Sequence, residues 1–171
     1  LYLLTPDGSD PNDATVTLER GREILRIGAS NVSVIGLELT AASAGVRIDH
    51  ADDVKLLGCS IHDIGFHGGN GVWIMGHRVR MADCDVFNIG GHGVFVQGYP
   101  KENRVDDRLD VVVENNYVHH TGQVNSHGIG IWITGQGVRV RHNLIHDTPR
   151  CGLFGYGRFC ELSYNRIRHT N

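Results

Sequence analysis

Long apolar runs are missing from the sequence. No stretch approaches the roughly 18–20 consecutive apolar residues that a membrane-spanning helix needs, so membrane insertion is not expected. The chain opens on LYLLTPDG, which has neither a Met nor a charged start followed by an apolar core, so no targeting segment is recognisable. This opening, together with a repeat left incomplete at Asn171, indicates a segment that is covalently continuous with further repeats of a longer protein.

Two other absences exclude further classes of protein. Charge of one sign is not in excess: 16 Lys and Arg against 19 Asp and Glu give a net charge of −3, and the basic residues are scattered. Nucleic acid is therefore not an expected partner. The four cysteines contain no CxxC pair, so zinc and thioredoxin-type redox sites have no support. With only 4 prolines, the 23 glycines indicate tight turns more than disorder.

The sequence does contain a repeat, and its 171 residues are compatible with one domain. An alternating apolar pair begins at six aligned positions, separated by 22, 25, 32, 27 and 22 residues: Val32, Val54, Val79, Val111, Val138 and Cys160. A second short segment follows each pair, led by Leu37, Cys59, Cys84, Asn116, Asn143 and Asn165. A third opens on Gly45, Gly71, Gly93, Gly130 and Gly152. Each repeat therefore has three short segments with alternating apolar residues.

Three such segments per repeat, without a helix-length apolar pattern, predict an all-β fold, a right-handed parallel β-helix. We expect a single-stranded solenoid of about six coils with three short strands each over residues 23–171, preceded by an irregular, hairpin-like lead-in over residues 1–22. Leucine-rich repeats need a Leu-rich frame that is missing, and a propeller blade needs about 40 residues or more. In a β-helix, aligned residues of successive coils lie about 4.8 Å apart.

The unequal steps between repeats locate three insertions. Ten extra residues fall in Tyr99–Asp110, five around Gln123–His127 and three at Phe66–Asn70. The last two insertions occupy the same turn, the one that enters the Gly-led strand. Because insertions gathered on one side of a solenoid often mark its binding face, we expect a ligand there.

An aromatic row is predicted beside these insertions. The outward position of the Gly-led strands reads Arg47, Trp73, Phe95, Trp132 and Phe154, and two residues further on it reads Asp49, Met75, Gln97, Thr134 and Tyr156. Exposed rings can stack on the apolar faces of sugars while polar neighbours bind hydroxyls. Alternatively, loops or an adjoining domain cover these rings, or the rings brace the sheet through same-face pairs.

We therefore predict a site that binds a polysaccharide or oligosaccharide. It comprises Trp73, Phe95, Trp132, Phe154 and Tyr156, together with His92 and His127, which stand just before the Gly-led strand. His67 and Arg150 stand at the same edge. A His there could act as an acid or a base, but hydrogen bonding to sugar hydroxyls demands less of it.

The remaining histidines align in two neighbouring columns. His62, His119 and His146 share one column, and the next holds Asp63, Asn88, His120, Asp147 and His169. Both columns are interpreted as turn ladders more than as catalytic groups. A metal site formed by His119 and His146 is not expected, because their column offers no third ligand at close range and Phe87 separates His62 from His119. No cofactor is expected.

Two further columns have structural interpretations. Asn116, Asn143 and Asn165 are expected to form a side-chain amide ladder. Cys59 and Cys84 share the preceding positions of that column, where both a disulfide and a pair of stacked thiols are compatible with the spacing. Cys160 is expected in the core.

With the coils aligned, the sequence resembles a known family. The segments NNYVHHTG (115–122), VRVRHNLIHDTP (138–149) and ELSYNRIRHTN (161–171), with the opening at 1–39, resemble right-handed β-helix proteins of carbohydrate metabolism, closest to glycoside hydrolase family 141. The resemblance implies a secreted enzyme, extracellular or periplasmic, that degrades a complex polysaccharide at the face made by the Gly-led strands. It also implies that the main catalytic carboxylates lie on coils after residue 171.

Catalytic residues therefore stay unassigned. Glycoside hydrolysis needs two carboxylates about 5–10 Å apart, and the Gly-led strands show one outward acid, Asp49. Two alternatives remain: a non-catalytic carbohydrate-binding or structural solenoid, and a polysaccharide lyase. A lyase is the less favoured enzyme, because Asp52 and Asp53 fall in turns and no calcium site with a basic residue on one face is recognisable.

Overall fold

The structure is a computed structural model that describes residues 23–98 and 108–171. The expected lead-in over 1–22 and most of the insertion at Tyr99–Asp110 lie outside the described residues. The described chain consists of strands and turns and contains no helix. Accordingly, no helix within the described ranges is long and apolar enough to cross a membrane.

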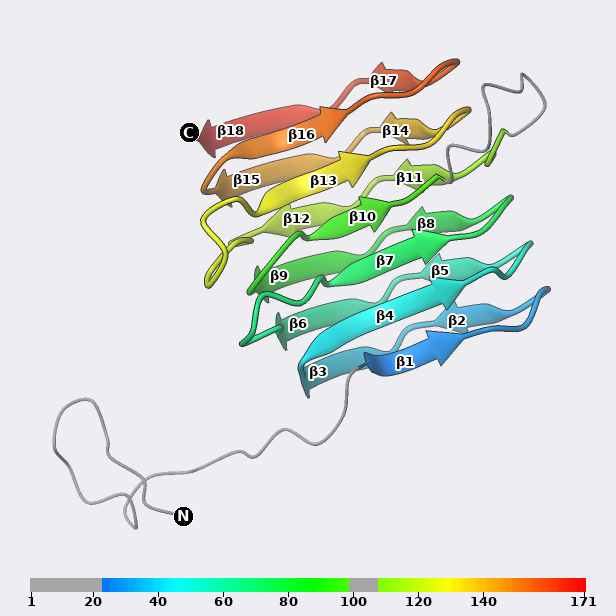
Figure 1. The fold of residues 1–171 in the computed structure, drawn as a ribbon, viewed down its shortest axis with the longest axis horizontal. Coiled ribbons are helices and arrows are strands. Elements are labelled where there is room, and N and C mark those ends of the chain that lie inside the picture. Colours follow the sequence, from blue (N-terminus) through cyan, green and yellow to red (C-terminus); the bar gives the residue numbers. More distant parts are fainter. Residues whose placement is uncertain (1–22, 99–107) are drawn as a thin grey trace, which may run out of the picture.

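The strands form three parallel sheets (Figure 1). Sheet A contains β1 (Glu23–Ile27), β4 (Ala44–Asp49), β7 (Val72–Met75), β10 (Val94–Val96), β13 (Ile129–Ile133) and β16 (Cys151–Gly155). Sheet B contains β2 (Ser33–Ile35), β5 (Lys55–Leu57), β8 (Arg80–Ala82), β11 (Val112–Glu114), β14 (Arg139–Arg141) and β17 (Glu161–Ser163). Sheet C contains β3 (Glu38–Ala42), β6 (Ser60–Ile64), β9 (Asp85–Ile89), β12 (Tyr117–His119), β15 (Leu144–Thr148) and β18 (Arg166–Thr170).

Each coil contributes one strand to each sheet, in the order A, B, C, and the next coil lies on top of it. The six coils with three strands each confirm the predicted parallel β-helix. The strand Glu23–Ile27 begins the first coil as part of sheet A, where it pairs with β4.

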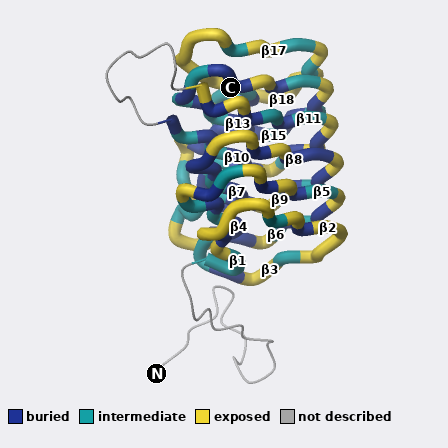
Figure 2. Tube along the Cα trace, turned by 90° about the vertical axis from the view of Figure 1, so that its right-hand side faces the viewer, coloured by how far each residue is buried: buried dark blue, intermediate teal, exposed yellow. Residues whose placement is uncertain are grey.

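The core fills the interior of the coils because alternate residues of every strand point inward. In the second coil Ile48, Leu56 and Ile61 come from sheets A, B and C, and each is 0 % exposed. Figure 2 shows the coils stacked from β1 and β3 to β17, with buried and exposed residues interchanging along them. In the last coil the aligned residues Leu162 and Ile167 are 51 % and 43 % exposed.

Successive coils approach each other closely near the start of the sheet A strands, and for this reason only Gly fits at these aligned positions. A Cβ placed on Gly45 would lie 1.9 Å from the carbonyl oxygen of Gly71, and one on Gly130 would lie 2.5 Å from that of Gly152. Such distances are far inside van der Waals contact, so a side chain there would force the backbones of two coils apart.

Every coil contains one left-handed residue other than Gly at the end of its sheet C segment. We call these residues the left-handed column: Ala41, Asp63, Asn88, His120, Asp147 and His169, all with φ between 50° and 61°. Asn, Asp and His adopt this backbone region more readily than most residues other than Gly. The expected placement of this column in a turn is wrong, because every member except His120 is the last residue but one of a sheet C strand.

The predicted amide ladder connects sheets B and C. Asn116 Nδ2 donates to Asn143 Oδ1 at 3.0 Å, and Asn143 Nδ2 donates to Asn165 Oδ1 at 2.9 Å. Before the ladder, Cys59 and Cys84 are both buried free thiols, and burial raises the pKa of Cys84 to about 11. Of the two alternatives for this pair, the structure has the stacked thiols.

Candidate functional site

The aromatic side chains predicted on the Gly-led strands lie in one row across sheet A. Register pairs Arg47 with Trp73 and Trp73 with Phe95. It then pairs Phe95 with Trp132 and Trp132 with Phe154. We call these five residues the sheet A row. Their predicted alignment is confirmed, and it follows from the parallel register because each of these residues lies two positions after a Gly of the aligned column.

The inner rings of the sheet A row stack on one another. The ring centroids of Trp73 and Phe95 are 5.8 Å apart, and those of Phe95 and Trp132 are 4.4 Å apart, with interplanar angles of 29° and 19°. The guanidinium carbon of Arg47 lies 4.6 Å from the centroid of the Trp73 ring. Neighbouring side chains therefore cover the faces of these half-buried rings. Trp73, Phe95 and Trp132 thus fit the alternative to sugar binding, in which the rings stabilise the sheet by packing on one another.

Open aromatic surface is found at the other end of the row. Phe154 is 41 % exposed and Tyr156 is 63 % exposed. Their centroids are 6.5 Å apart at an angle of 78°, so one ring meets the edge of the other. Met75, predicted to extend the same exposed face, is only 4 % exposed. Both exposed rings belong to the last described coil, where no further strand of sheet A lies beside them.

The two predicted histidines at the edge of the row differ. His92 is half-buried, its ring centroid lies 4.8 Å from that of Trp132, and its Nδ1 accepts the backbone N–H of Ile129 at 3.1 Å. Burial, and secondly the charge of Arg150, lower the pKa of His92. His127 is exposed in the turn between β12 and β13. His92 therefore belongs to the packed part of the row, whereas His127 faces solvent.

The insertions lie on the predicted side of the coils. The turn at 123–127 lies on the preceding coil, because Val124 and Asn125 both donate backbone N–H groups to the carbonyl oxygen of Gly90, at 3.1 and 2.8 Å. Phe66 in the other insertion is 64 % exposed, and Val124 is 56 % exposed. Apolar side chains thus project from the turns that enter sheet A.

Two carboxylates reach sheet A, and arginine accompanies both. Arg47 lies 3.5 Å from Glu23 and 3.6 Å from Asp49. Hydrogen bonds from Arg26 and then from His50 lower the pKa of Asp49. A general acid needs a raised pKa, so Asp49 is unsuited to donate a proton at neutral pH.

The amino-terminal end of the sheet A row also borders a hollow. Its volume is about 210 Å³, and Glu23, Arg47, Trp73 and the turn at 68–70 contribute to its lining. Ligand pockets usually measure about 300–1,000 Å³. The hollow is therefore large enough for a small polar group and too small for a saccharide chain.

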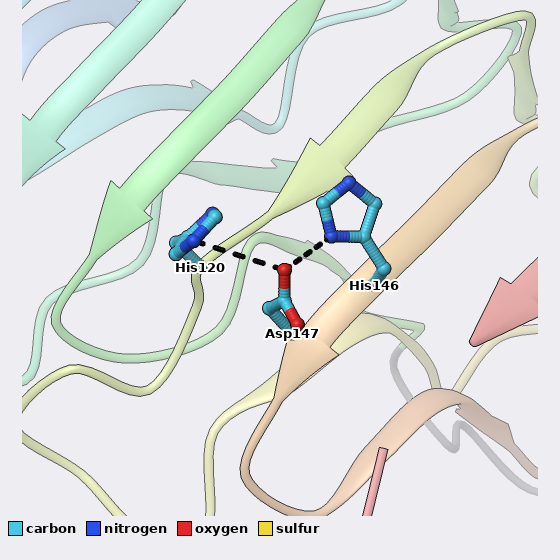
Figure 3. Close-up of side chains that lie close together, drawn as sticks. All are labelled: His120, His146 and Asp147. Carbon is cyan, nitrogen blue, oxygen red and sulfur yellow. Dashed lines mark hydrogen bonds and ion pairs between the residues drawn. The ribbon is translucent and has the colours of Figure 1, made fainter. Parts of the chain in front are cut away.

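The column of His62, His119 and His146 was expected in turns, but the three residues lie on strands of sheet C. Rings stack from His62 to Phe87 at 4.7 Å, from Phe87 to His119 at 5.1 Å, and from His119 to His146 at 5.1 Å. Phe87 interrupts this column between His62 and His119. The left-handed column beside it supplies further ligands, because ligand atoms of His120, His146 and Asp147 lie within 4.8 Å of one another (Figure 3).

Two features of these surfaces were missed by sequence reasoning. Glu23 was not assigned to sheet A because β1 has no opening Gly that would align it with the other strands. The group on sheet C was missed because each histidine column was considered separately. The signal that could have revealed this group is the pair 119–120, which aligns with the pair 146–147 on the next coil.

The fold and the sequence agree on the family. The sequence matches the family described as "Right handed beta helix region" over residues 20–167, and the chain belongs to that family. No curated protein matches the sequence significantly. Among solved structures, the chain is similar to an alginate lyase from Paenibacillus sp. str. FPU-7, with 15 % identity and a TM-score of 0.52. The match covers 90 % of this chain and 78 % of the lyase, and at this identity it shows a shared fold.

Proposed function

We propose that this chain is the β-helix part of a carbohydrate-active enzyme and that sheet A binds a polysaccharide or oligosaccharide. The observation that carries the proposal is the alignment of aromatic side chains in the sheet A row, beside the turns that contain two of the insertions. Phe154 and Tyr156, on the last described coil, offer apolar ring faces to a sugar. The inner rings Trp73, Phe95 and Trp132, with His92, support this surface from within the sheet, and His127 offers a hydrogen bond at its edge.

The proposed reaction is glycoside hydrolysis in an extracellular or periplasmic setting, as the resemblance to family 141 implies. Glu23 and Asp49 are ion-paired with arginine and give no acid–base pair. We therefore place the main catalytic carboxylates on coils that continue the β-helix.

A polysaccharide lyase is the second candidate, and the similarity to a solved alginate lyase favours it. A lyase cleaves by elimination and leaves an unsaturated sugar, whereas a hydrolase adds water across the bond. Incubating the full-length protein with polyuronates and neutral plant polysaccharides, with ultraviolet absorbance and reducing ends as readouts, distinguishes the two. Binding without either product would support the non-catalytic alternative.

The binding surface is tested by Phe154→Ala and Tyr156→Ala in the full-length protein. Each ring is expected to contribute about 0.5–1.5 kcal/mol, so oligosaccharide affinity should fall about 2- to 10-fold per substitution. Calorimetric titration measures the affinity. Tyr164→Ala is the matched control, because Tyr164 is 81 % exposed and stacks on His142 outside the sheet A row. Unchanged affinity in both variants would remove sheet A as the binding surface.

A further inference from the structure

A group of titratable side chains lies where sheet C turns into sheet A, outside the proposed saccharide surface. His120 and Asp147 are successive members of the left-handed column, and His146 precedes Asp147 in β15. Figure 3 shows His120 and His146 on opposite sides of the Asp147 carboxylate. Asp147 Oδ2 lies 2.6 Å from His146 Nδ1 and 3.7 Å from His120 Nε2.

We propose that His120, His146 and Asp147 bind one divalent transition-metal ion of the zinc type. Zinc bonds to nitrogen and oxygen measure about 2.0–2.2 Å, which separates ligand atoms in a tetrahedral site by about 3.3 Å. The 2.6 Å and 3.7 Å separations lie on either side of that value. Each of these two distances differs from it by less than about 1 Å, and the ligand atoms of all three residues lie within 4.8 Å of one another.

The partners of His120 leave its Nε2 free to bind a metal. His120 Nδ1 lies 2.7 Å from His119 Nδ1, so one of these nitrogens donates to the other. His119 Nε2 lies 3.3 Å from Asp85 Oδ1, a buried oxygen with no hydrogen-bond partner. A proton on His119 Nε2 faces this oxygen, which makes His119 Nδ1 the acceptor and His120 Nδ1 the donor. Neutral His120 then carries its lone pair on Nε2.

His146 is held by its second nitrogen as well. Its Nε2 lies 2.7 Å from Tyr117 Oη. When a metal replaces the proton between Nδ1 and Asp147, the imidazole proton moves to Nε2 and the tyrosine oxygen accepts it, because a phenol can donate or accept. Histidines that bind metals usually donate their other N–H to such a partner. Tyr117 and His119 are therefore positioning residues of the proposed site.

The composition of the site selects the class of ion. Two imidazoles and one carboxylate suit zinc and its neighbours in the first transition row, whereas calcium and magnesium prefer oxygen ligands throughout. His146 is buried, Asp147 is half-buried and His120 is exposed. Solvent can therefore fill a fourth position, or the exposed His169 can, since its Nδ1 lies 3.4 Å from Asp147 Oδ1. The bound ion would connect two neighbouring coils.

The test is titration of the metal-free full-length protein with ZnCl₂, followed by calorimetry and by the melting temperature. We expect one ion per chain at this site, a melting temperature that rises with zinc concentration, and no response to calcium. His120→Asn and Asp147→Asn keep residue types that tolerate a left-handed backbone, and each should weaken zinc binding by 10-fold or more. Tyr117→Phe, which removes no ligand, should weaken it about 10- to 100-fold.

The matched control is His77→Asn, which breaks an exposed His–Asp pair with a 3.2 Å contact between His77 Nδ1 and Asp52 Oδ1. Zinc affinity should not change in this variant. The proposal is overturned if the wild type binds no zinc, or if Asp147→Asn and Tyr117→Phe both bind it as the wild type does. An equal loss in His77→Asn would also overturn it, since binding would then belong to surface histidines in general. No outcome depends on saccharide binding.

Discussion

At the residue scale, His92 shows how packing decides what a side chain of the sheet A row can do. Its Nδ1 accepts a backbone N–H, and its ring lies against Trp132. The accepted hydrogen bond and the burial of the ring favour the neutral imidazole. A proton on Nδ1 would break the hydrogen bond to Ile129 and would place a charge in a half-buried site. His92 is therefore a poor general acid, although its Nε2 can still hydrogen-bond a hydroxyl.

The lowered pKa of His92 predicts a contribution to the pH dependence of stability. The unfolded chain, with a His pKa of about 6.5, binds a proton at a higher pH than the folded chain does. The contribution of His92 is therefore fully present above about pH 6.5 and decreases as the pH falls toward the folded pKa. Urea unfolding of the wild type and of His92→Asn at pH 8 and pH 5 measures it.

Asn offers an acceptor close to the position of Nδ1 and does not titrate. As the pH is lowered, the unfolding free energy of the wild type should therefore fall more than that of His92→Asn. The other histidines titrate in both proteins and cancel from this difference. Parallel pH profiles would contradict a lowered pKa for His92.

The sequence predicted which residues align in the sheet A row but not how their rings are oriented. Alignment follows from the repeat, since parallel register keeps Trp73, Phe95 and Trp132 in one row. Ring orientation depends on χ angles that settle when neighbouring rings pack together, and aromatic rings about 4.8 Å apart cover each other's faces. Trp73 and Trp132 each have a neighbour of the row on both sides, whereas Phe154 lies on the last described strand of sheet A.

At the element scale, the amide ladder fixes the turn between sheets B and C. Asn143 is 1 % exposed and uses both ends of its amide. Its Oδ1 accepts from the backbone of Asn116 at 2.9 Å, and its Nδ2 donates to the carbonyl oxygen of Val113 at 3.0 Å. Each coil thus satisfies backbone groups of its neighbour that water cannot reach.

We predict that Asn143→Ala destabilises the protein strongly. Each buried group left without a partner costs about 1–3 kcal/mol, so the loss should reach several times the effect of an ordinary surface substitution. In a chain of residues 1–171, Asn165→Ala should cost less, because Asn165 is half-buried at the last described position of the ladder and water reaches it. Chemical denaturation of that chain measures both. Similar values for the two variants there would show that burial does not set the strength of the ladder.

At the scale of the whole molecule, stability is expected to be approximately a sum over neighbouring coils. Ile145 and Ile167 occupy the same column of sheet C in adjacent coils, and register pairs them. Ile145 is 0 % exposed, whereas Ile167 is 43 % exposed in the last described coil. The energetic value of Ile167 therefore depends on whether another coil lies on it.

This dependence tests the proposed continuation of the β-helix. Ile145→Ala should cost about 2–5 kcal/mol. If further coils follow, Ile167→Ala in the full-length protein should cost nearly as much. Ile35→Ala is the control, because Ile35 is 64 % exposed and should have little effect. A cost for Ile167→Ala as small as that of the control would argue against a covering coil.

The whole-molecule fold was predictable because it depends on a periodic pattern. All six repeats contain the apolar alternation, and most have the Gly near the start of the sheet A strand. A strand that is assigned wrongly in one repeat can therefore be recognised by comparison with the other repeats. The group on sheet C depends instead on how a left-handed turn directs His120 and Asp147 toward His146. That direction is a property of backbone dihedral angles, and no repetition of residue type indicates it.

The left-handed column has a consequence for how this scaffold can be altered. Ala41, Asp63, Asn88 and His120 occupy it with nearly the same φ, so the conformation is imposed by the coil and tolerates different side chains. A substitution there changes the chemistry of one coil and leaves its path intact. Evolution, or an engineer, can therefore place a chosen sequence of functional groups along the molecule at regular intervals of one coil.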